Sequence, residues 1–195
     1  MNYLVDDFLL FLIYSFIGWV CEVIYCSIPA KKFVNRGFLV GPYCPIYGFG
    51  ALAVINILIP FSDNPVIVYF FAVIITSIIE YATGYLLERV YHLKWWDYSK
   101  YKFNIHGRVV LHNSIIFGAL SLLTIYHINP VLLGMINKFS LSMRTNVSLI
   151  LLFLFLIDNI ISTLNALKLS NNLSKLHLIS DEIKQKVSEK LFIKS

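Results

Sequence analysis

Four acidic residues interrupt long apolar stretches of the sequence, and they are the side chains best suited to carry chemistry. They are Glu22, Glu80, Glu88 and Asp158. An ionised carboxylate in apolar surroundings costs at least a few kcal/mol, so it persists only where a partner or water compensates its charge. Such a group binds a solute or a coupling ion, acts as a base, or forms a structural ion pair. For Glu22 and Glu88 structural pairing and function both stay open, whereas the deeper Glu80 and Asp158 favour function.

The apolar stretches around these acids have the length of membrane-spanning helices. Hydrophobic residues make up 58% of the 195 residues and charged residues 14%, far from the averages of soluble domains. Crossing about 30 Å of hydrocarbon takes roughly 20 apolar residues. Runs of this length occupy residues 8–27, 40–59, 66–87, 109–128 and 147–166. The sequence therefore predicts an all-α integral membrane protein with about five transmembrane helices.

Basic residues are distributed unevenly between the predicted loops. Fourteen of the sixteen Lys and Arg residues fall in or beside the first loop, the third loop and the C-terminal tail. Because short loops rich in Lys and Arg stay in the cytoplasm, we expect the N-terminus outside and the C-terminus inside. Basic loops facing anionic lipid also account for the net charge of +5, so no nucleic-acid partner is expected.

The first four predicted spans have the pattern of a duplicated unit. The shared landmarks are Gly18, Glu22 and Tyr25 in the first unit and Gly84, Glu88 and Tyr91 in the second. Each unit runs from outside to inside and back, which predicts two parallel helical-hairpin repeats related by an axis along the membrane normal. The predicted transmembrane domain covers 1–167, with repeat 1 at about 8–60, repeat 2 at about 66–128 and a fifth span at about 146–167.

Polar residues recur on one face of two predicted helices. The two stripes are Glu80, Gly84 and Glu88 in the third span, and Asp158, Ser162 and Asn165 in the fifth. Residues three or four positions apart share a helix face. Because polar faces avoid lipid, we expect the stripes to face each other or a water-filled cavity.

The stretch FVNRGFLVGPYCPIYGFGAL, residues 33–52, combines Asn35, Arg36 and Gly37 with two prolines at the start of an apolar run. Gly41 with Pro42 and Pro45 is expected to prevent regular helix over residues 38–47. Irregular backbone at membrane depth is tolerated only where protein buries it or where it lines a cavity. Its free amides, with Arg36, would suit a phosphate, a carboxylate or one of the buried acids.

The second predicted cytoplasmic loop, residues 92–114, reads HLKWWDYSKYKFNIHGRVVLHNS. Trp95, Trp96 and Tyr98 are typical of the headgroup level, where the neighbouring lysines would meet lipid phosphates. A membrane anchor explains these residues but does not explain Asp97.

The C-terminal residues 168–195 form a separate predicted unit. Apolar residues recur every three or four positions from residue 169 to residue 191, with lysines and acids between them. This spacing predicts a cytoplasmic amphipathic helix, which would lie on the bilayer or dock a partner.

The two loops and their flanking spans resemble the CmpB-like ABC-transporter type IV family. The similarity covers residues 16–120 and is carried by the elements N-R-G-F-L-x-G-P-x-C-P-I-Y-G and W-W-D-Y-S, so the fifth span and the tail fall outside it. The resemblance implies a bacterial multi-pass protein of the cell membrane that acts as a permease subunit. The family motif positions are Glu22, Asn35, Arg36, Gly37, Gly41, Pro42, Cys44, Pro45, Tyr47, Gly48, Glu80, Glu88, Trp95, Trp96, Asp97, Tyr98, Asn104, Gly107 and Arg108.

The favoured function is transport of a small solute or ion through a polar site near the cytoplasmic leaflet. The residues expected to bind it are Glu22, Asn35, Arg36, Glu80, Glu88, Asp97, Asn104, Arg108 and Asp158. Five spans are few for a complete pathway, so a homodimer or a separate ATPase subunit is expected as a partner.

Two other functions stay open: an assembly or regulatory membrane subunit, and a membrane-embedded enzyme or carrier for a phosphate-bearing lipid. The sequence contains no P-loop, no cluster with metal-ligand spacing and no nucleophile–base motif. We therefore assign no catalytic residue and expect no cofactor and no metal.

Overall fold

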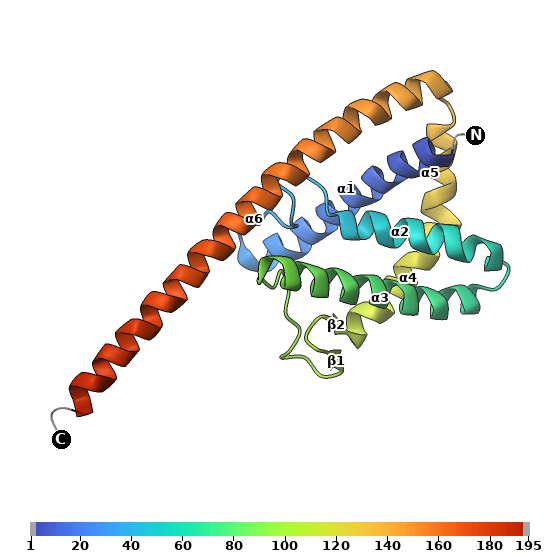
Figure 1. Cartoon of the computed structure of the whole chain (residues 1–195). Helices are drawn as coiled ribbons and strands as arrows, with labels where there is room; N and C mark the ends of the chain where they lie inside the picture. Colours follow the sequence, from blue (N-terminus) through green and yellow to red (C-terminus); the bar gives the residue numbers. More distant parts are fainter. Residues whose placement is uncertain (1–2, 193–195) are drawn as a thin grey trace.

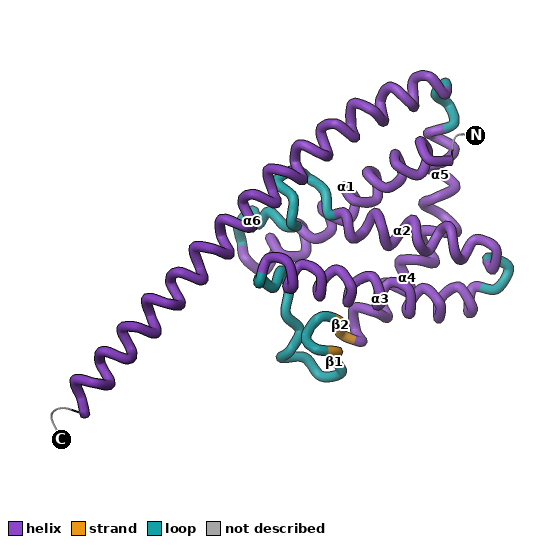
Figure 2. Tube along the Cα trace, viewed as in Figure 1, coloured by secondary structure: helices purple, strands orange, loops and turns teal. Residues whose placement is uncertain are grey.

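A computed structural model describes the backbone of residues 3–192 and the side chains of residues 4–176 (Figures 1 and 2). The chain is mostly helical. The first half contains α1 (Tyr3–Ala30), α2 (Pro45–Leu58), the short 3-10 helix η1 (Ile59–Phe61) and α3 (Pro65–Tyr91). The second half contains β1 (Asn104–Ile105), β2 (Val109–Val110), α4 (Leu111–Leu123), the π-helical turn η2 (Thr124–Ile128), α5 (Asn129–Ile136) and α6 (Leu141–Phe192).

Four helical segments are long and apolar enough to cross a membrane: Leu4–Ala30, Pro65–Tyr91, Leu111–Ile136 and Leu141–Leu176. A shorter apolar segment, Pro45–Phe61, lies between the first two. The prediction of a helical chain with four to five long apolar helices is therefore confirmed. The orientation of the bundle in the membrane and the two hairpin repeats stay predictions.

The second predicted span begins five residues later than expected. Residues 35–44 contain no regular helix, and α2 starts at Pro45. Proline suits the first position of a helix, because its φ angle is already helical and its missing N–H is not needed there. The predicted irregular backbone is thus confirmed for residues 38–44 and wrong for residues 45–47, which Pro45 starts as helix.

The fourth predicted span also begins later and ends later than expected. Asn104 and Ile105 pair with Val110 and Val109 in a two-stranded antiparallel ribbon, so α4 starts only at Leu111. Its helical course then continues through η2 and α5 to Ile136.

The fifth predicted span and the tail are a single helix. α6 has 52 residues and contains neither proline nor glycine, so no break marks the boundary predicted at residue 168. At 1.5 Å per residue it is about 78 Å long, far more than the bilayer core. Figure 1 shows its C-terminal half extending well beyond the other helices. The amphipathic positions expected at Ile179, Ile183, Val187 and Leu191 lie outside the residues whose side chains are described.

Two small apolar cores hold the hairpins together. Val54, Leu58, Val68, Ala72 and Ile125 form one core between α2, α3 and η2. The other joins α1, α2 and α5 through Leu10, Tyr14, Ile55 and Ile136. α1 packs along α2 and α3 packs along α4, whereas α6 contacts α1 and α3.

The two long loops meet at one end of the bundle. The ring of Phe38, from the first loop, lies 5.2 Å from the ring of Tyr91 and 5.4 Å from that of Trp95. Residues 31–44 and 92–103 are therefore neighbours in space, and most of the predicted site residues lie on them or on the helix ends beside them.

We expect Gly48→Ala to destabilise the bundle, because α2 approaches α1 too closely at this position for a side chain. A Cβ atom on Gly48 would lie 2.5 Å from the carbonyl oxygen of Phe11, a backbone atom that cannot turn away. Overpacking of this kind costs about 1–3 kcal/mol. Gly50→Ala is the matched control, since a Cβ atom there meets nothing within 4 Å. Thermal unfolding in detergent should show a lower midpoint for the first variant only, and equal midpoints would contradict this packing.

Candidate functional site

Glu22 links the first loop to α1 and α2. Its Oε1 accepts a hydrogen bond of 2.6 Å from the Tyr47 hydroxyl, and its Oε2 lies 3.7 Å from Nε of Arg36. The indole N–H of Trp19 donates to the side-chain oxygen of Asn35 at 2.8 Å. Both polar residues of the Asn-Arg-Gly element are thus held against α1.

Glu88 makes a stronger ion pair with the second loop. Its Oε2 accepts from Nη2 of Arg108 at 2.7 Å and from Nε at 3.1 Å. The guanidinium also lies 5.4 Å from the ring centres of Tyr81 and Tyr85, and charge-assisted pairs of this geometry are among the strongest hydrogen bonds in proteins. Each predicted repeat therefore carries a Glu–Arg pair between its long helix and its loop.

Asp158 holds the irregular backbone that precedes α2. Its two carboxylate oxygens accept hydrogen bonds from the backbone amides of Val40 at 3.1 Å and of Gly41 at 2.8 Å. The Ser162 hydroxyl donates to the same carboxylate at 2.9 Å. Of the three kinds of group expected to bind these free amides, the structure thus contains an acid of the chain itself, although Asp158 is only partly buried.

The two polar stripes do not face each other, which was the first of the two arrangements expected for them. The stripe on α6 meets the first loop through Asp158 and Ser162. The stripe on α3 is covered by the second loop, because Gly84 lies against the side chains of Trp96 and Arg108. The first loop therefore lies against the stripe on α6, and the second loop lies against the stripe on α3.

Asp97 and Asn104 shape the second loop. Asp97 accepts hydrogen bonds from the hydroxyl and, at 2.9 Å, from the backbone amide of Ser99, and these bonds lower the pKa of its carboxyl. Asn104 accepts from the amide of Gly107 at 2.8 Å and donates to the carbonyl of Tyr101 at 2.8 Å. Gly107 has a φ of 70°, which favours glycine. The contacts of these residues are within their own loop.

The tryptophans of this loop are packed against protein as well. Trp96 donates its indole N–H to the carbonyl of Arg108 at 2.8 Å, and Trp95 lies edge-on to Tyr91. Their contacts fix the loop over the end of α3, which a headgroup anchor would not require.

Glu80 is the most buried of the four acids inside the apolar stretches. Its exposed fraction is 5%, and its Oε2 has no hydrogen-bond partner in the part of the chain that the structure describes. Tyr98 of the second loop lies near both Glu80 and Asn113 of α4. Burial, followed by the charges of Glu80 and Glu22, raises the pKa of the Tyr98 hydroxyl. Side chains of α1, α2, α3, α4 and the two loops therefore form one cluster. We call it the polar cluster, and its members are Glu22, Arg36, Tyr47, Glu80, Tyr98 and Asn113.

A buried ion pair at the opposite end of the bundle was missed from the sequence. Asp6 of α1 has an exposed fraction of only 2% and lies 2.6 Å from Nη1 of Arg144 of α6. Asn137 accepts a further hydrogen bond of 3.1 Å from Arg144. The signal that could have found this pair is that both charged residues were expected on the outer side of the membrane.

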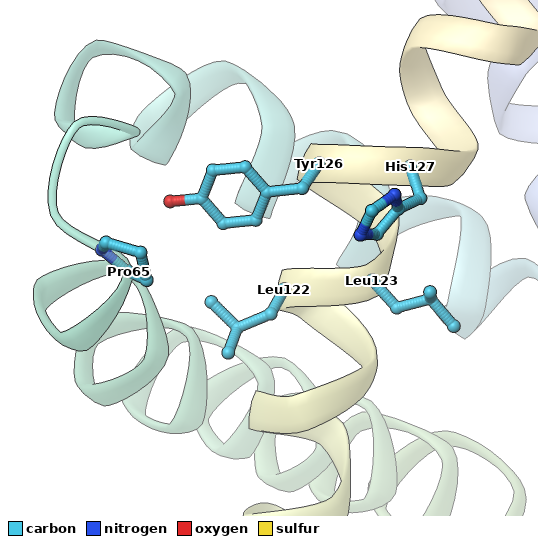
Figure 3. Close-up of a pocket in the computed structure, with 5 residues that line it drawn as sticks. All are labelled: Pro65, Leu122, Leu123, Tyr126 and His127. Carbon is cyan, nitrogen blue, oxygen red and sulfur yellow. The ribbon is translucent and has the colours of Figure 1, made fainter.

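The hollow in Figure 3 is separate from the polar cluster. It encloses about 320 Å³ and is lined by Pro65, Leu122, Leu123, Tyr126 and His127. It lies at the start of α3, where Tyr126 donates to the carbonyl of Ser62 at 2.6 Å. None of the predicted site residues lines it.

A family model described as "Putative ABC-transporter type IV" matches residues 9–163 of the chain. The chain belongs to this CmpB-like family. The match extends beyond the similarity expected at residues 16–120, and it includes most of the fifth span, which was expected to fall outside. No curated protein and no solved structure matches the chain. Family membership and the long apolar helices together fit a multi-pass membrane transport protein.

We expect Asp158→Ala to open the first loop of the CmpB-like protein and expose Cys44, which is buried beside that loop. Hydrogen bonds to a charged group contribute about 1.5–3 kcal/mol, so losing them should speed thiol labelling of Cys44 about tenfold or more. The measurement is the rate of maleimide modification in a background where Cys21 and Cys26 are serine.

Asn159→Ala serves as the control, because the side chain of Asn159 bonds only to the Phe155 carbonyl of its own helix. Labelling at the wild-type rate in Asp158→Ala would show that Asp158 does not hold the loop closed.

Proposed function

We propose that this CmpB-like protein is the permease subunit of a transporter in a bacterial cell membrane, and that its polar cluster binds a small solute or ion near the cytoplasmic leaflet. The observation that carries the proposal is Glu80, a carboxylate buried in an apolar bundle with one oxygen unpartnered. Ionisable groups at membrane depth are costly, and they mark solute and ion pathways in membrane proteins.

The polar cluster has the composition that a selective site needs. It combines carboxylates, a guanidinium and phenol hydroxyls, which come from separate helices and from a loop. Because these groups come from separate helices and from the second loop, we propose that binding there is coupled to movement of that loop. Glu88 and Arg108 fix the base of that loop through their ion pair.

The energy for transport would come from a partner. The chain has no P-loop, so ATP would be hydrolysed by a separate subunit docked on the cytoplasmic loops or on α6. A homodimer would supply the further spans that a complete pathway requires.

The phosphate-lipid alternative has less support. Arg36 and Arg108 are paired with Glu22 and Glu88, and the amides of Val40 and Gly41 are occupied by Asp158. The groups expected to hold a phosphate are thus already engaged. An assembly or regulatory subunit is the second candidate, and it is favoured by the C-terminal half of α6, because this half extends beyond the other helices (Figure 1).

The transport proposal predicts that Glu80→Gln abolishes the activity without removing the protein from the membrane. Cells lacking the gene should differ from wild type in their content of at least one small solute or ion, as measured by mass spectrometry of cell extracts. A plasmid with the wild-type gene should restore that content, and Glu80→Gln should not.

Asp63→Asn is the matched control, because Asp63 is exposed in the turn between η1 and α3 and should restore the content fully. Full restoration by Glu80→Gln, or unchanged contents in the deletion strain, would argue against transport through this site. Purification in mild detergent then distinguishes the possible partners. Recovery of an ATPase subunit in near-equal amount supports a permease, whereas enrichment of one lipid supports a lipid carrier.

A further inference from the structure

The four acids inside the apolar stretches differ in how their charges are compensated. Glu22 and Glu88 each lie beside an arginine, and Asp158 accepts from two backbone amides and a hydroxyl. Glu80 has neither a basic partner nor a backbone amide among the described residues, although it is the most buried of the four. One negative charge in the polar cluster is therefore uncompensated when Glu80 is ionised.

Among the residues whose side chains are described, no basic group forms an ion pair with Glu80. The Tyr98 hydroxyl faces it from the second loop, and Asn113 of α4 lies behind Tyr98. Glu22 of α1 is close enough for the two carboxylates to repel each other. On the α2 side, the Tyr47 hydroxyl donates its hydrogen bond to Glu22. Arg36 forms its ion pair with Glu22 as well.

A buried carboxylate in this position requires one positive charge from outside the chain. Burial of an isolated ion in apolar surroundings costs several kcal/mol or more, which either a bound proton or a bound cation removes. An anion is disfavoured, because it would add a like charge beside two carboxylates. The unpartnered Oε2 atom is the place where a proton or a cation can bind without breaking an existing contact.

We propose that Glu80 is the binding site of a cation of single charge, a proton or an alkali-metal or ammonium ion, and that the second loop closes this site with Tyr98. The proposal deepens the proposed function and rests on it for its role in transport, since it narrows the solute or coupling ion to a cation. Binding itself is measured on the purified protein without transport.

Infrared difference spectroscopy of the purified full chain in phosphatidylcholine vesicles tests the site. We expect the wild type to show the stretching band of a protonated carboxyl group at neutral pH. Two titrations distinguish the ligands. If the band is lost only as the pH rises, Glu80 binds a proton. If the band is lost at fixed pH on adding sodium, potassium or ammonium chloride, Glu80 binds the added cation. The band should be absent from Glu80→Gln in both titrations.

Two further variants keep the assignment open to refutation if Glu80→Gln folds poorly. Glu80→Asp retains a carboxyl group and should retain a responsive band, and Asp63→Asn should be identical to wild type. A responsive band that is the same with and without Glu80, or no response of any carboxyl band to pH or cations, would overturn the proposal.

The two proposals fail in different ways. If the Glu80 band responds to pH or cations, but cells with Glu80→Gln have the same solute and ion content as wild type, the cation site stands and its role in transport is refuted. If the solute or ion content changes in Glu80→Gln but no carboxyl band responds, the transport proposal stands and the cation site is refuted.

Discussion

Backbone amides that leave a helix within a membrane must find another acceptor, because hydrocarbon offers none. In this protein the amides of Val40 and Gly41 are bound by the carboxylate of Asp158, which lies more than a hundred residues away in the chain. This contact allows residues 38–44 to stay irregular and sets where α2 begins. Tyr47, in the first turn of α2, can then reach Glu22. The polar cluster thus depends on a carboxylate that is not part of it.

Other carboxylates at this end of the bundle have partners for their charges as well. Glutamates near the ends of α1 and α3 are neutralised by arginines of the adjoining loops, so each loop is fixed by charge as well as by aromatic packing. Asp97 and Asn104 shape the second loop from within and leave Tyr98 directed at α3. Against this background Glu80 stands out, because every neighbouring acid has its partner.

The long helices could be predicted from the sequence, because hydrophobic length and proline positions act locally. Structural pairing was one of the two roles left open for Glu22 and Glu88, and one of the buried acids was among the groups expected to bind the free amides. Spacing shows which residues share a helix face, but it does not show what lies opposite. The loops that lie against the stripes of Glu80 and Asp158 could therefore not be predicted. The pair of Asp6 and Arg144 depends on a contact across 138 positions, for which local pattern carries no information.

The unbroken course of α6 has a mechanical consequence. Arg144, which is paired with Asp6 near one membrane face, and Asp158, which grips the loop before α2, are side chains of the same helix. From Asp158 to Phe192 that helix continues for about 50 Å at 1.5 Å per residue, without a proline or glycine hinge. Because no hinge interrupts α6, a displacement of its far end would move both attachments together.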